Sequence, residues 1–111
     1  MKDLKISKEL LSEVLNLNIT YIERCNNSII YKISVYDREE EINIYELAHK
    51  CKEWVLKQGY RIIINYSKDI KVGIRILKSG KYVYSNENKS EVEAIVKACE
   101  WMLKEQNNDT K

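Results

Sequence analysis

The spacing of hydrophobic residues changes several times along the chain, and each change predicts a new element. A first helix is expected to begin at Ser7, whose hydroxyl can accept a hydrogen bond from a free backbone N–H of the first turn. Over residues 19–24 and 28–36 the period becomes two, which is typical of strands with one buried face. Asn26 and Asn27 separate the two strands and tolerate the left-handed backbone of a tight turn. The N-terminal third is therefore predicted to be a helix followed by a β-hairpin.

A second helix is predicted to open the region from 43 to 105. Asn43 and Glu46 have the spacing of a capping box, in which each side chain accepts a hydrogen bond from the other residue's backbone N–H. Gly59 follows the last apolar turn, where a glycine can take the left-handed conformation that ends a helix. Trp54 lies late in this helix and is expected to be part of the core.

Three strands and a third helix complete this region. The strands are expected at 60–66, 70–77 and 81–85, and the connections between them are short enough for hairpins. Ser90 is expected to cap the last helix, and residues 107–111 are expected to fray at its end.

These elements predict one α+β domain over residues 1–111, in which helices pack on an antiparallel sheet. Residues 43–105 form an α-β-β-β-α unit, and residues 1–36 supply the preceding helix and hairpin. The hairpin either extends the sheet of that unit or adds a small second layer. The oligomeric state stays open, because an unpaired strand edge could build a dimer whereas edge lysines could prevent one.

Composition gives no sign of a catalytic or metal site. Three cysteines show no paired spacing, which argues against a disulfide framework and indicates a reducing cytoplasm. His49 is the only histidine, and no nucleophile or metal-ligand pattern accompanies it. The three glycines are isolated, so no phosphate-binding loop is present, and no apolar run approaches the length of a bilayer span. We therefore predict no enzyme activity, no cofactor and no membrane partner.

Charge is divided between two segments. Residues 60–89 contain seven basic and two acidic residues, a local net charge of +5, whereas residues 37–46 contain five acidic and one basic residue, a net charge of −4. The acidic run at 37–41 is expected to be a solvated connection. Lys71 and Arg75 are expected on one strand face with Gly73 between them, where a phosphate or an acidic protein surface could dock, although the face could equally be solvated. The candidate partner-binding residues are Lys71, Arg75, Lys78, Lys81, Asp37, Glu39, Glu40 and Glu41.

Three segments, 42–54, 58–60 and 90–101, resemble blocks of small phage and prophage proteins with an alpha-beta-alpha sandwich domain, a family of unknown function. The order α-β-β-β-α also resembles double-stranded RNA-binding domains, where lysines that open the last helix grip phosphates. That second similarity is one of topology, since Glu91 and Glu93 occupy the position of those lysines.

Together, the first resemblance and the missing catalytic motifs imply a non-enzymatic accessory protein of phage or prophage origin. Such a protein would act in the cytoplasm of the bacterial host by stoichiometric binding to a host protein or ribonucleoprotein complex. An inhibitor of a host defence system, such as an anti-CRISPR protein, is one concrete form of this hypothesis. The alternatives are a double-stranded-RNA-binding-like module that uses the basic strands and a minor structural component of the phage.

Overall fold

A computed structural model of the protein describes residues 4–34, 36–69 and 71–109, apart from the side chains of residues 36, 37, 108 and 109. The predicted strand start at Ile70 and the tail residues 110 and 111 lie outside the described residues. In chain order the elements are α1 (Lys8–Leu15), β1 (Ile19–Cys25), β2 (Ser28–Ile33), β3 (Tyr36–Asn43), α2 (Ile44–Lys57), β4 (Arg61–Tyr66), β5 (Val72–Lys78), β6 (Lys81–Asn88) and α3 (Glu91–Asp109).

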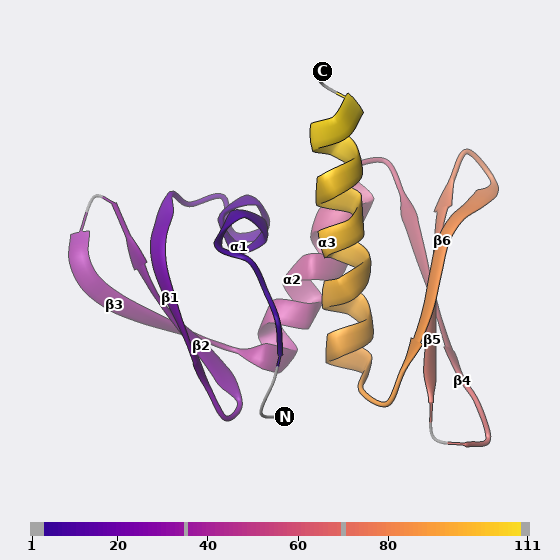
Figure 1. The fold of residues 1–111 in the computed structure, drawn as a ribbon, viewed down its shortest axis with the longest axis horizontal. Coiled ribbons are helices and arrows are strands. Elements are labelled where there is room, and N and C mark those ends of the chain that lie inside the picture. Colours follow the sequence, from indigo (N-terminus) through magenta and orange to yellow (C-terminus); the bar gives the residue numbers. More distant parts are fainter. Residues whose placement is uncertain (1–3, 35, 70, 110–111) are drawn as a thin grey trace.

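The helices lie between two three-stranded sheets, so the α+β class is confirmed (Figure 1). Sheet A has the order β1-β2-β3 and sheet B the order β4-β5-β6, and both are antiparallel. In the view of Figure 1, sheet A lies to the left of the helices and sheet B to the right. The hairpin at the N-terminus therefore belongs to a second layer and does not extend the C-terminal sheet.

One hydrophobic core joins the three layers. Each sheet turns a single face toward the helices, and in β5 of sheet B the buried residues occupy every second position, as a period of two requires. The core consists of nearly or fully buried side chains from the helices and from both sheets, among them Leu10, Ile29, Leu47, Ile74 and Ile95. No helix among the described residues is long and apolar enough to cross a membrane.

The acidic run at 37–41 forms part of β3, and the prediction of a connection there was wrong. β3 pairs with β2 along its length, with Ile42 opposite Ile29 and Glu39 opposite Lys32. Glutamate has a low strand propensity, but the buried Ile42–Ile29 pair and the oppositely charged cross-strand pair favour the ladder. Residues 36–43 thus complete sheet A and lead directly into α2.

The predicted start of α1 and the predicted start and end of α2 are confirmed by the residues that cap them. Ser7 Oγ accepts a hydrogen bond from Leu10 N at 3.0 Å, and Asn43 Oδ1 accepts one from Tyr45 N at 2.8 Å. Gly59 follows α2 with a φ of +84°, as a left-handed C′ residue. The last helix runs to Asp109 and so includes residues 107–109 of the tail that was expected to fray.

The turns of the two sheets differ. In sheet B, Ser79 and Gly80 both have positive φ, 53° and 80°, which matches a two-residue turn of type I′. In sheet A a hairpin forms at Asn26 and Asn27 as predicted, but neither asparagine has a positive φ. The left-handed turn expected at these asparagines is therefore absent.

Glu100 of α3 connects the N-terminal layer to the C-terminal unit. Its carboxylate accepts hydrogen bonds from Ser7 N at 2.6 Å and from Ser7 Oγ at 2.8 Å. Arg24 Nε of β1 also donates to the carbonyl oxygen of Leu4, which fixes the segment that precedes α1. These partly buried contacts hold α1 against α3.

Candidate binding faces of the two sheets

The face of sheet B that points away from the helices is basic and partly apolar. The register places three rows across its strands: Asn65, Gly73 and Glu87; Ile63, Arg75 and Ser85; and Arg61, Leu77 and Tyr82. We call these nine residues the basic face. Its charged side chains are two exposed arginines and one exposed glutamate.

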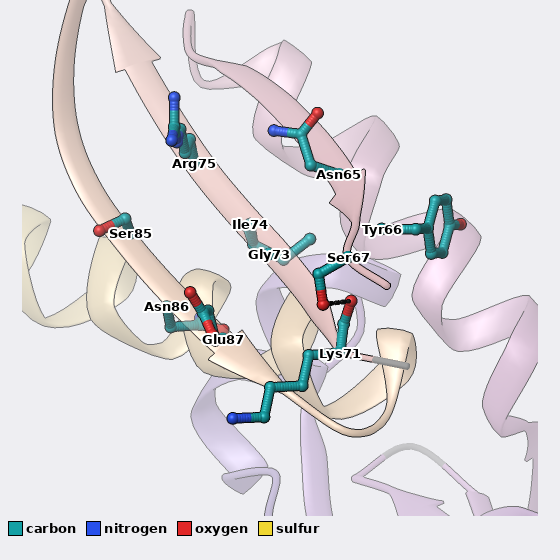
Figure 2. Close-up of a pocket in the computed structure, with 10 residues that line it drawn as sticks. All are labelled: Asn65, Tyr66, Ser67, Lys71, Gly73, Ile74, Arg75, Ser85, Asn86 and Glu87. Atoms are coloured by element: carbon teal, nitrogen blue, oxygen red, sulfur yellow. Dashed lines mark hydrogen bonds between the residues drawn. The ribbon is translucent and has the colours of Figure 1, made fainter. Parts of the chain in front are cut away.

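A shallow hollow of about 270 Å³ lies at the end of the basic face near Gly73. Gly73 lines the hollow with bare backbone, and a Cβ at this position would lie 3.8 Å from the carbonyl oxygen of Asn65, an ordinary contact distance. Figure 2 shows Lys71 and Arg75 at opposite ends of the hollow, with Gly73 between them. The predicted pair of cations flanking an exposed stretch of backbone is therefore present, although Glu87 also lines the hollow.

Two hydrogen bonds shape the loop beside this hollow. Ser67 N donates to the carbonyl oxygen of Lys71 at 2.9 Å, so the loop closes tightly before β5. The ring of Tyr66 turns away from the hollow (Figure 2), and its hydroxyl donates to Glu91 Oε1 at 2.7 Å. This hydrogen bond raises the pKa of Tyr66 above its ordinary value, because Glu91 stabilises the protonated hydroxyl.

Tyr82 lies at the other end of the basic face. Tyr82 is 61% exposed and is one of several exposed tyrosines in the described strands. The guanidinium carbon of Arg75 lies 5.3 Å from the ring centroid, within the range of a cation–π contact. Arg75 thus borders the hollow and also contacts the one large exposed ring of this face.

The other two predicted basic residues lie away from the basic face. Lys78 Nζ lies 5.2 Å from the ring centroid of Tyr60, and Lys78 borders a hollow with Trp101 and Glu105 on the helix side of the sheet. Lys81 is exposed at the turn, where it pairs with Lys78 across the hairpin. The structure therefore groups Lys71 with Arg75 and separates both from Lys78.

The outward face of sheet A is acidic. Its central rows are Glu23, Ile30 and Glu41, and Tyr21, Lys32 and Glu39. We call these six residues the acidic face. Lys32 is the one cation among them, and its Nζ lies 5.6 Å from the ring centroid of Tyr21. Three exposed glutamates thus surround one lysine that already contacts an aromatic ring.

The predicted acidic residues divide between the two sides of β3. Glu39 and Glu41 belong to the acidic face, whereas Glu40 lies opposite Tyr31 on the helix side and forms an ion pair with Arg38 at 2.9 Å. Burial, followed by the charges of Glu40 and Glu46, raises the pKa of Tyr31. The side chain of Asp37 lies outside the described residues.

The sequence analysis missed several residues that complete these faces. Tyr82 and Glu87 continue the basic face onto β6, and Glu23 adds β1 to the acidic face. Arg61 was counted in the charge of the segment but not selected as a candidate. Strand alternation offered a signal for each of them, but only the cross-strand register shows which alternating positions share a face.

The buried cysteines are part of the core. The thiol of Cys99 lies 3.8 Å from the carbonyl oxygen of Cys51, and its interaction with the side chain of Cys51, followed by burial, raises the pKa of Cys99. A protonated buried thiol is a poor nucleophile. Cys25 is exposed at the hairpin turn, and none of the three cysteines is in a disulfide.

The comparisons with known proteins give one family. Residues 52–105 match the model of PmbA/TldA metallopeptidase domain 1, which spans the end of α2, all of sheet B and most of α3. The match covers a little under half of the chain, so it is a similarity of this segment. No curated protein and no solved structure gives a significant match.

This finding overturns the resemblance to phage sandwich proteins and to double-stranded RNA-binding domains. The segments that suggested those families consist mostly of helix caps and core positions. Any unit that packs two helices on a three-stranded meander needs such positions, so they do not distinguish one family from another.

The name of the matched family raises the question of a metal site. Among the described residues, no group of three or more histidine, cysteine, aspartate or glutamate side chains is placed to hold a metal ion. His49 lies outside the matched segment, and its Nε2 is 3.6 Å from Glu53 Oε1 on the exposed side of α2. The donor set of the described residues does not fit a metallopeptidase centre.

Proposed function

We propose that this protein acts by binding rather than by catalysis, and that the basic face of sheet B binds nucleic acid. The observation that carries the proposal is the gathering of Arg61 and Arg75 on a sheet face that no described helix or strand covers, next to a hollow bordered by Lys71. Cations on an open surface attract phosphates, and backbone accessible at a glycine lets a phosphate approach closely.

The positions of the charged side chains favour the basic face over the rest of sheet B as the binding site. Arg61 and Arg75 lie on neighbouring strands in adjacent rows, so both guanidinium groups can reach one stretch of a polyanion. Glu87 is the single acidic residue of the basic face, and its charge would weaken the binding of an anion in the hollow. We extend the proposal to a cytoplasmic location, where three free cysteines would stay reduced.

The test is the affinity of a labelled oligonucleotide of about 12 nucleotides, measured by fluorescence anisotropy at low salt. Arg61→Glu with Arg75→Glu should lower the affinity more than tenfold, which corresponds to about 1.4 kcal/mol. The matched control, Glu39→Lys with Glu41→Lys, reverses two charges on the acidic face and should not weaken binding. Equal loss in both double variants, or no binding by the unmodified protein, would overturn the proposal.

A second candidate function is stoichiometric binding to a basic protein through the acidic face. The observation that favours it is that Glu23 joins Glu39 and Glu41 on one exposed sheet surface. Such a surface is complementary to a nucleic-acid-binding protein, and charge complementarity would speed the encounter. The more specific hypothesis of a host-defence inhibitor drew on the phage resemblance and has no independent support in the fold.

Affinity capture from a cell lysate tests this second candidate. The unmodified protein should retain a basic partner in a one-to-one ratio, and Glu39→Lys with Glu41→Lys should release it. Retention of the same partner by that variant would rule out the acidic face as its contact.

A further inference from the structure

The ring of Tyr82 offers a surface that a duplex would not use. Bases in a duplex are stacked on one another, so a protein ring can stack on a base only where the strand is single and the base is free. Tyr82 is 61% exposed on the same face as the two arginines, and the guanidinium of Arg75 lies over its ring. An open antiparallel sheet that displays aromatic and basic side chains is a common platform for single strands.

Arg75 links the ring to the anion site. Its guanidinium lies 5.3 Å from the centroid of Tyr82, and Arg75 also lines the hollow at Gly73. A base stacked on the exposed part of the ring would therefore lie beside a cation that neutralises the adjacent phosphate. Arg75 would therefore contact the ring on which the base stacks and also neutralise a phosphate.

The distance between the two ends of the face suits a short stretch of strand. Gly73 and Leu77, the row partner of Tyr82, are four residues apart on β5, which corresponds to about 13 Å at the usual rise of a strand. Such a length accommodates a few nucleotides, near the lower end of about 4 to 16 nucleotides for small single-strand-binding folds.

We infer that the nucleic acid bound by the basic face is single stranded, with a base stacked on Tyr82 and a phosphate held at the Gly73 hollow between Lys71 and Arg75. This inference rests on the function proposed above and narrows it to one class of nucleic acid. It requires that bases as well as phosphates contribute to the affinity.

The experiment measures anisotropy of labelled oligo-dT and oligo-U of about 12 nucleotides, with a duplex of equal length and inorganic polyphosphate as competitors. Tyr82→Ala should weaken single-strand binding about 5- to 100-fold, the range that stacking of one base on an aromatic ring supports. Tyr82→Phe keeps the ring and should stay within about twofold of the unmodified protein. Tyr45→Ala removes a tyrosine of similar exposure on α2 and should have no effect. Far-UV circular dichroism of each variant confirms that it is folded.

The outcomes separate this inference from the broader proposal. Ring-dependent binding of either oligonucleotide, with weaker competition by duplex and polyphosphate, supports the inference. If Tyr82→Ala binds normally while Arg75→Glu does not, or if duplex or polyphosphate competes equally well, the single-strand inference is wrong and the basic face remains a polyanion site. If no oligonucleotide binds, both proposals fall together.

Discussion

Sheets A and B have the same construction and opposite chemistry. Each is a three-stranded antiparallel meander that packs one face on the central helices and leaves the other face uncovered (Figure 1). The buried inward positions are isoleucines in sheet A and isoleucine or valine in sheet B, whereas most charged residues at outward positions are glutamates in sheet A and arginines in sheet B. The inward residues are constrained by the shared core, and the outward ones are not. The contrast between the outer faces is therefore the better guide to function.

The largest expected effect tests whether the two sheets share one core. Ile29→Ala in sheet A and Ile74→Ala in sheet B each remove a side chain that is almost fully buried. Each substitution should lower the free energy of unfolding by about 2 to 5 kcal/mol, because it leaves a cavity in a packed interior. Equilibrium unfolding in urea measures the change. Ile63→Ala, on the outer side of sheet B, is the control and should cost less. A small effect of Ile29→Ala alone would show that sheet A is not part of the common core.

The next effect concerns the contact that joins the two halves. Glu100→Gln weakens two charge-assisted hydrogen bonds to Ser7 and should destabilise the protein by about 1 to 2 kcal/mol. In a double-mutant cycle with Ser7→Ala, the two effects should not add, because both substitutions act on the hydrogen bond from Ser7 Oγ to Glu100. Lys104→Gln changes an exposed residue of the same helix and serves as the control. Additive effects would contradict the role of Glu100 as the connection.

The turns give a smaller contrast between the sheets. Gly80→Ala should destabilise the protein by about 1 to 2 kcal/mol, since a residue with a Cβ is strained at a φ of +80°. Asn27→Ala in the equivalent turn of sheet A should cost less, because that turn has no left-handed residue. Thermal unfolding measures both changes. Equal costs would mean that the backbone of the two turns does not differ in this way.

The smallest expected effects are changes in oligonucleotide affinity and in its salt dependence when single charges of the basic face are removed. Glu87→Gln removes the one acid beside the Gly73 hollow and should raise oligonucleotide affinity about two- to fivefold at low salt. Arg75→Gln should reduce the slope of affinity against salt by about one unit. Glu41→Gln, the equivalent neutralisation on the acidic face, should leave the slope unchanged. An unchanged slope for Arg75→Gln would remove that residue from the contact.

Most of the fold could be predicted because local signals agree with it. Helix caps at Ser7 and Asn43, the left-handed Gly59 and the alternation along β5 each depend on a few neighbouring residues. β3 was missed because its charged outward residues resemble a loop, and its strand character depends on pairing with β2. The pairing of one strand with another is not encoded in either segment alone.

The candidate site could be predicted only in part for the same reason. Lys71, Gly73 and Arg75 are neighbours in sequence, so their grouping at the hollow followed from alternation along one strand. The contact of Arg75 with Tyr82 depends on the register of β5 with β6, and the separation of Lys78 depends on which side of the sheet faces the helices. Net charge over a segment does not reveal either arrangement.

The most direct test of the difference between the two outer faces is a nuclear magnetic resonance titration of the isotopically labelled protein with oligo-dT. Amide resonances of the basic face, including those of Gly73, Arg75 and Tyr82, should shift together and saturate at a single affinity. Resonances of the acidic face, such as those of Glu23 and Glu41, should stay in place. Shifts confined to sheet A or to the helices, or no shifts at low salt, would contradict the assignment of nucleic-acid binding to sheet B.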